Sequence, residues 1–152
     1  MTYARRTAAL LVKILAVAAL VAGTGLAVAA PPAYANGKPC KGHKVRACVD
    51  LSRQKAWLMK DRHVVYGPVN IASGRKGYRS DKGRFHVTFK DRDHVSRIFH
   101  APMPYSVFYN GGEAFHQGSR KVRSHGCIHL SHKSAKRFYR YLHKGDVVRV
   151  HH

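Results

Sequence analysis

Acidic residues are scarce in this chain. Its 152 residues include 7 Asp and Glu against 28 Lys and Arg, which gives a formal net charge of +21 at pH 7. Because no acidic cluster offsets this charge, we expect polyanionic partners. The basic residues run from Lys38 to Arg149 without forming one stripe. This spread favours a solvated basic surface held at an anionic cell-wall polymer over a dedicated nucleic-acid site.

Internal repeats, heptads and a long linker are also missing, so we expect a single domain that is a monomer. The long apolar run lies near the N-terminus, over residues 14–30, and basic residues precede it. The small-x-small pattern at residues 33–35 is typical of a signal-peptidase site. We therefore predict a signal peptide over 1–35 and an exported domain over 36–152. An uncleaved membrane anchor is the alternative.

Cysteine is limited to three residues. Cys40 and Cys48 flank a short loop that contains Gly, Lys and His, and we expect them to form a disulfide in an exported protein. Cys127 is then left unpaired. In an exported protein such a cysteine either pairs with another chain or is a reactive thiol. Its neighbours are Gly126 and two histidines rather than apolar residues, which favours reactivity over inert burial.

The pattern of apolar residues predicts a mainly β fold with one C-terminal helix after Cys127. The helix begins near Ser131, presents one apolar stripe and has Gly145 as its C-terminal stop. Asn110-Gly111-Gly112 predicts a hairpin turn. The stripe residues are Ala135, Phe138, Tyr139 and Leu142. The expected strands cover residues 48–51, 56–59, 64–66, 69–71, 85–89, 106–109, 114–116 and 147–150.

Cys127 and His116 are the candidate catalytic pair. His116 ends a predicted strand eleven positions before Cys127. A cysteine beside a histidine is sufficient for thiol acyl transfer, because the imidazole takes the thiol proton and the sulfur attacks a carbonyl. Gly126 allows the backbone to approach a substrate closely. We expect the amides of His125, Gly126 and Cys127 to converge on the developing oxyanion, and the His125 side chain to support the loop.

A neutral group is expected to orient His116. No acidic residue lies between Glu113 and Asp146. Two candidates remain open: the Ser119 hydroxyl and a backbone carbonyl around residues 117–118.

Zinc binding is an alternative for the same residues. His125, Cys127 and His129 alternate, so an extended strand would place them on one face, where His116 could join them. The second-layer carboxylate that usually supports such ligands is missing nearby. We therefore predict no metal at this site.

The segment Ser124-His125-Gly126-Cys127-Ile128-His129-Leu130 resembles the signature of YkuD-type L,D-transpeptidases, commonly Ser-His-Gly-Cys-(Ile/Val)-Arg-(Leu/Met). The resemblance extends over about residues 48–150. Upstream, residues 67–74 and 81–87 resemble the substrate-side segment of the family, and residues 90–96 and 103–108 resemble small secreted actinobacterial members.

This resemblance implies a β-sandwich or barrel-like catalytic domain in the bacterial cell envelope or cell wall, or outside the cell. It implies peptidoglycan stem peptides as substrates, Cys127 as the acylated nucleophile, His116 as general base, and no cofactor. Ser124 supports the cysteine loop in this view, and Tyr105 and His129 are candidate substrate contacts.

Four residues depart from the family pattern. His129 replaces the usual arginine, which puts carboxylate binding by that side chain in question. Ser80-Asp81 replaces Thr-Pro, and Gln117 replaces a frequent glycine. Two other functions stay open: an L,D-carboxypeptidase on the same scaffold, and a non-catalytic cationic wall-binding protein or zinc protein. Nucleic acid is not an expected partner.

Overall fold

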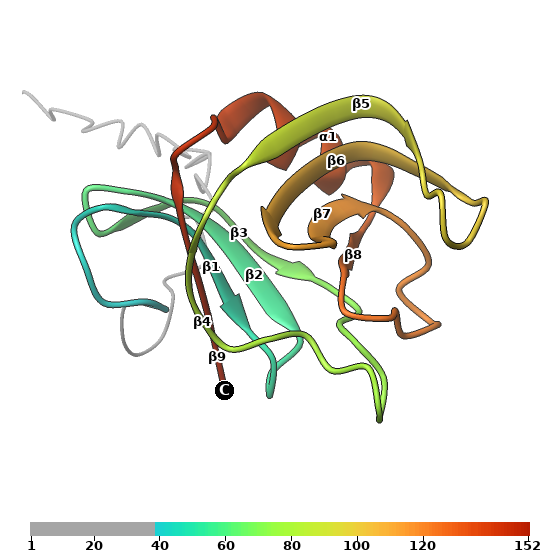
Figure 1. The fold of residues 1–152 in the computed structure, drawn as a ribbon. Helices are drawn as coiled ribbons and strands as arrows, with labels where there is room; N and C mark the ends of the chain where they lie inside the picture. The colour runs from blue at the N-terminus through green and yellow to red at the C-terminus, as the bar shows by residue number, and fades with distance from the viewer. Residues whose placement is uncertain (1–38) are drawn as a thin grey trace, which may run out of the picture. The chain divides into compact units, whose positions relative to one another are not determined.

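A computed structural model describes residues 39–152, which form two sheets and one helix (Figure 1). The sheet orders are β3-β2-β1-β9-β4 and β5-β6-β7-β8. The predicted mainly β fold is confirmed, whereas the predicted signal peptide lies outside the described residues. No helix of residues 39–152 is long and apolar enough to cross a membrane. The elements are β1 Val45–Asp50, β2 Lys55–Lys60, β3 His63–Asn70, β4 Gly83–His86, β5 Phe89–Val95, β6 Pro102–Asn110, β7 Glu113–Gln117, β8 Ile128–Leu130, α1 His132–Tyr141 and β9 Val147–His151.

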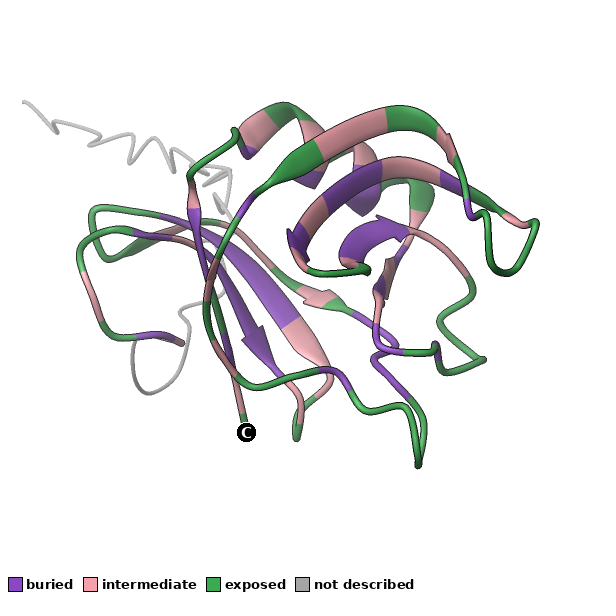
Figure 2. Ribbon diagram, viewed as in Figure 1, coloured by how far each residue is buried: buried purple, intermediate pink, exposed green. Residues whose placement is uncertain are grey.

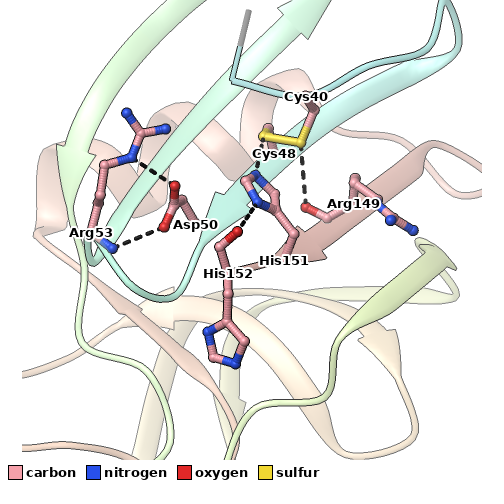
Figure 3. The surroundings of a disulfide bond; sticks show 7 residues. All are labelled: Cys40, Cys48, Asp50, Arg53, Arg149, His151 and His152. Atoms are coloured by element: carbon pink, nitrogen blue, oxygen red, sulfur yellow. Dashed lines mark hydrogen bonds and ion pairs between the residues drawn. A yellow bond between two sulfur atoms is a disulfide. The ribbon is translucent and has the colours of Figure 1, made fainter.

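The first sheet is centred on β1, which pairs antiparallel with β2 and parallel with β9. A disulfide joins Cys48, in the middle of β1, to Cys40, with 5.8 Å between their Cα atoms (Figure 3). Both sulfurs lie in a small apolar cluster with Trp57 and Met59. The predicted disulfide is therefore confirmed, and it holds the segment before β1 onto the sheet.

The main core lies where the two sheets and α1 meet, as the buried segments of Figure 2 show. Phe115 of β7 packs on Phe138 of α1, with ring centroids 5.1 Å apart. Ser131 caps the helix by accepting a hydrogen bond from the Ser134 amide, so the predicted start near Ser131 is confirmed. The expected stop at Gly145 is wrong, because α1 already ends at Tyr141.

The predicted strand over 85–89 is interrupted. Its first half is β4, which pairs with β9 in the first sheet, and its second half begins β5, which pairs with β6 in the second. At the crossing, Val87 is 1% exposed and Phe89 is 53% exposed, so alternate side chains of this segment do not lie on one buried face. Period-two alternation reports an extended chain but not which sheet the chain joins.

The structure also tests two predicted strands, over 64–66 and 69–71, and the predicted hairpin turn. The segments expected over 64–66 and 69–71 belong largely to one strand, β3, which runs through a cis Gly67–Pro68 bond. The predicted hairpin is confirmed: β6 and β7 pair antiparallel on either side of Gly111 and Gly112.

Candidate active site

Strands β7 and β8 bring the candidate catalytic pair together. They are parallel, with Phe115 opposite Ile128 and His116 opposite His129. Phe115 faces α1, so the alternation of side chains directs His116 to the other face of the sheet. Cys127 immediately precedes β8, and the Ala114 backbone on β7 lies close enough to the thiol to lower its pKa. The Cys127 thiol therefore lies beside Ala114, which is two residues before His116 on β7.

His116 is buried and held by the backbone. Its Nδ1 lies 2.8 Å from the Gln117 carbonyl oxygen, which only accepts, so Nδ1 carries the proton and Nε2 is left as a base. Burial lowers the pKa of His116 to about 4. The imidazole is therefore neutral at neutral pH. Of the two orienting groups left open above, the structure has the backbone carbonyl. The Ser119 hydroxyl instead accepts from the Lys121 amide.

The Cys127 thiol is half-buried and free of any disulfide. Burial raises its pKa, and the nearby Glu113 carboxylate raises it further, while the Ala114 backbone acts in the opposite direction. The thiol donates to the Gly112 carbonyl oxygen at 3.6 Å. Within residues 39–152 no hydrogen bond joins the thiol to His116. The resting pair is thus a thiol and a neutral imidazole, and proton transfer must accompany attack.

Ser124 organises the loop that carries Cys127. Its buried hydroxyl donates to the Cys127 carbonyl oxygen at 2.5 Å and accepts from the Gly126 amide at 3.1 Å. This hydrogen bond changes the expectation for the oxyanion site. The Gly126 amide is already used inside the loop, so of the three amides expected to bind the oxyanion only those of His125 and Cys127 remain candidates.

Glu113 is a residue that sequence reasoning missed. One carboxylate oxygen accepts from the Asp81 amide at 2.9 Å and the other from Asn110 at 3.2 Å. Gly126 has φ +120°, and a Cβ placed there would lie 3.1 Å from that first oxygen. Glu113 therefore lies directly under the cysteine loop, and the positive φ at residue 126 favours glycine there. Its position after a hairpin turn carried no signal of this contact, because the two residues are distant in sequence.

Ser80 is a second missed residue. It is buried, donates to the Gly126 carbonyl oxygen at 2.6 Å and accepts from the Gly74 amide at 3.0 Å. The cysteine loop is also bonded to this segment through the Ser124 amide and the Ser73 carbonyl, 3.1 Å apart. Ser80 thus fastens the loop to residues 73–80. The departure from Thr-Pro at this position retains the hydroxyl group.

His125 points outward and packs between aromatic rings. Its ring centroid lies 4.8 Å from that of Tyr78 and 4.5 Å from that of Phe99. Three loops therefore meet at His125, which agrees with the expectation that this side chain supports the loop.

His129 and Tyr105, the two candidate substrate contacts, are engaged within the protein. His129 Nδ1 donates to the Ser119 carbonyl oxygen at 2.8 Å, and its ring packs on His116 at 4.8 Å. Tyr105 packs against α1, on the rings of His132 and Tyr139 at 5.3 and 5.9 Å. These contacts give both side chains a structural role, and substrate contact stays a prediction.

The expected alternation of zinc ligands is not realised. β8 begins only at Ile128, so His125 and Cys127 lie in the preceding loop rather than on a strand with His129. Among the described residues, the group of three potential ligands is Cys40, Cys48 and His151, and the two sulfurs there are bonded to each other (Figure 3).

The model of the L,D-transpeptidase catalytic domain, YkuD, matches residues 44–150. This chain belongs to that family. The match spans both sheets, α1 and the cysteine loop, and so confirms the resemblance of the Ser124–Leu130 segment. No curated protein sequence matches the chain.

Solved structures of L,D-transpeptidases share the fold. The Stackebrandtia nassauensis enzyme is 28% identical with a TM-score of 0.72, covering 78% of this chain and 62% of its own. The Mycobacterium smegmatis enzyme is 21% identical with a TM-score of 0.66, covering 73% and 60%. A cysteine-to-serine mutant of the Enterococcus faecium enzyme is 24% identical with a TM-score of 0.62, covering 71% and 50%. This family member therefore spans less than two thirds of the length of each.

Proposed function

We propose that this chain is an exported L,D-transpeptidase that cross-links peptidoglycan stem peptides in the bacterial cell envelope through an acyl-enzyme on Cys127. The observation that carries the proposal is the position of the unpaired Cys127 thiol, which lies beside Ala114 of β7. Two residues further along this strand is the buried His116, whose Nε2 is free to accept a proton. Family membership supplies the reaction class. The disulfide and the N-terminal segment support export, because disulfides persist in oxidising compartments.

The neutral state of both groups determines the order of events. The Cys127 side chain rotates from the Gly112 carbonyl toward His116, and Nε2 takes the thiol proton as sulfur attacks the donor carbonyl. The amides of His125 and Cys127 stabilise the tetrahedral oxyanion. The protonated imidazole gives its proton to the amine of the donor's terminal residue, which then leaves as a free amino acid. An acceptor amine then attacks the thioester, His116 takes its proton, and the thiolate leaves and is reprotonated.

Incubation of the full chain with purified stem peptides tests this proposal by mass spectrometry. The expected product is a dimer with the mass of two stems less the free amino acid that the donor releases. Trimmed monomer alone identifies the carboxypeptidase alternative, and no product from folded protein refutes an acyl-transfer enzyme.

Cys127→Ala is expected to abolish the product and leave folding intact. The matched control is the double variant Cys40→Ala/Cys48→Ala, which removes two sulfurs but leaves the site in place. Trapping of a stem peptide on Cys127 by acid quenching is the direct readout. Rapid alkylation of the free thiol at neutral pH is a poor criterion, because burial raises the pKa of Cys127.

A further inference from the structure

A basic groove runs along the exposed face of α1. It is an open hollow of about 460 Å³ between the helix and Tyr66 of β3. The residues that line this basic groove are Tyr66, His132, Lys133, Lys136, Arg137 and Arg140.

Four permanent positive charges in the basic groove follow the helical period. Lys133, Lys136, Arg137 and Arg140 occupy positions i, i+3, i+4 and i+7, so they form one stripe opposite the buried residues of α1. With a rise of about 1.5 Å per residue, the stripe extends about 10 Å along the helix. The basic residues of the chain as a whole do not form one stripe, but these four share one face of α1.

These charges lack acidic partners. All seven Asp and Glu of the chain lie within the described residues, and none is on α1 or lines the basic groove. The ion pairs of residues 39–152 use Arg46, Arg53, His94 and His143 as the basic members. Because like charges on one helix face destabilise it, an unpaired stripe of this kind favours an external anion.

We propose that the basic groove binds a linear polyol-phosphate polymer of the cell wall, a chain whose phosphodiesters each carry one negative charge. Lys and Arg both bind phosphate, and neighbours on the stripe lie about 5–6 Å apart, which suits one phosphodiester for each basic residue. Nucleic acid fits less well, since a duplex carries one charge per about 1.7 Å and single strands require stacking platforms. The face of Tyr66, the single aromatic ring that β3 adds to the basic groove, is covered by Arg137, whose Cζ lies 5.9 Å from the ring centroid.

The basic groove ends beside the active site. His132 Nδ1 lies 2.8 Å from the Gln117 side-chain oxygen, and the Gln117 backbone carbonyl holds His116. A polymer in the basic groove is thus anchored next to the catalytic pair but on the helix side of the sheet. The inference rests on the proposed function only in that it takes the polymer from the cell wall.

Binding of the full chain to fluorescently labelled poly(glycerol phosphate) tests the inference, measured by fluorescence anisotropy across a salt series. The groove variant is Lys133→Gln/Lys136→Gln/Arg137→Gln/Arg140→Gln. The control is Lys41→Gln/Lys44→Gln/Arg92→Gln/Arg149→Gln, which removes the same charge from exposed positions elsewhere. We expect the affinity of the groove variant to fall at least about tenfold. Its salt slope should fall by up to about three, because each phosphate that a basic side chain neutralises on a single-stranded polyanion adds about 0.7 to the slope. The affinity of the control should fall less than about threefold.

Equal losses of affinity in the two variants overturn the inference, because net charge alone then binds the polymer. Equal binding of duplex DNA or poly-glutamate by the unmodified chain overturns the polyol-phosphate assignment. Should the fourfold groove variant fail to fold, the pairs Lys133→Gln/Arg137→Gln and Lys136→Gln/Arg140→Gln serve, each with a smaller expected loss of affinity. Turnover of soluble stem peptides separates the two proposals. If the chain turns over stem peptides but does not bind the polymer, only the basic-groove inference is refuted. If it binds the polymer but does not turn over stem peptides, only the proposed function is refuted.

Discussion

Acidification should destabilise this protein through His116. The side chain is 5% exposed, and burial lowers its pKa from 6.5 to about 4. The unfolded chain therefore binds a proton at this residue between those two values while the folded chain does not. The sign follows: the folded state loses stability as the pH falls from about 6.5 toward 4, and the loss is complete below 4.

The size of the effect follows from the pKa difference. At 1.36 kcal/mol per unit, His116 accounts for a loss of about 3 kcal/mol below pH 4, and about 2 kcal/mol of it is reached by pH 5. Asp50, whose pKa is lowered to about 2, acts in a different window, since its contribution is lost only as the pH falls below its ordinary value of 3.8.

Urea unfolding at pH 4.5 to 7.5 measures this loss, with the fluorescence of the single tryptophan, Trp57, as the signal. His116→Gln should flatten the pH dependence relative to the unmodified chain, and the difference between the two curves cancels the carboxyl groups that they share. His63→Gln, at an exposed position on β3, is the control and should leave the dependence unchanged. Parallel curves for His116→Gln and the unmodified chain would refute the assignment of a buried neutral imidazole.

Three further outcomes are expected. Ser80→Ala should lower the free energy of unfolding by about 1–3 kcal/mol, because the Gly126 carbonyl and the Gly74 amide lose a buried partner, and should slow acylation of Cys127. Ser80→Thr should restore both in urea titrations and quenched-flow assays, and a Thr variant as impaired as the Ala variant would contradict the role of the hydroxyl. Removing the Cys40–Cys48 disulfide by Cys40→Ala/Cys48→Ala should cost about 2–3 kcal/mol, measured by urea unfolding. Titration of the denatured, unmodified chain should find one free thiol, and three would contradict the bridge. His125→Ala should retain more stem-peptide turnover than His116→Ala, since His125 packs on Tyr78 and Phe99, and the reverse order would exchange the two roles.

Local pattern in the sequence was enough for several features. The helix after Cys127 follows from a capping serine and an apolar stripe of helical period, both of which act within a few residues. The hairpin at Gly111 and Gly112 follows from turn chemistry in the same way. The disulfide follows from counting three cysteines, two of them close together.

Pairing across the fold required the tertiary structure. The break at Val87 exists because β4 joins β9 and β5 joins β6, and the partners lie far away in sequence. For the same reason the local sequence around Ser80 did not predict its hydrogen bond to the Gly126 carbonyl, which lies 46 residues away. The sequence identified Cys127 and His116 by residue type and motif. The structure alone decided their protonation, because desolvation depends on what surrounds a group in space rather than along the chain.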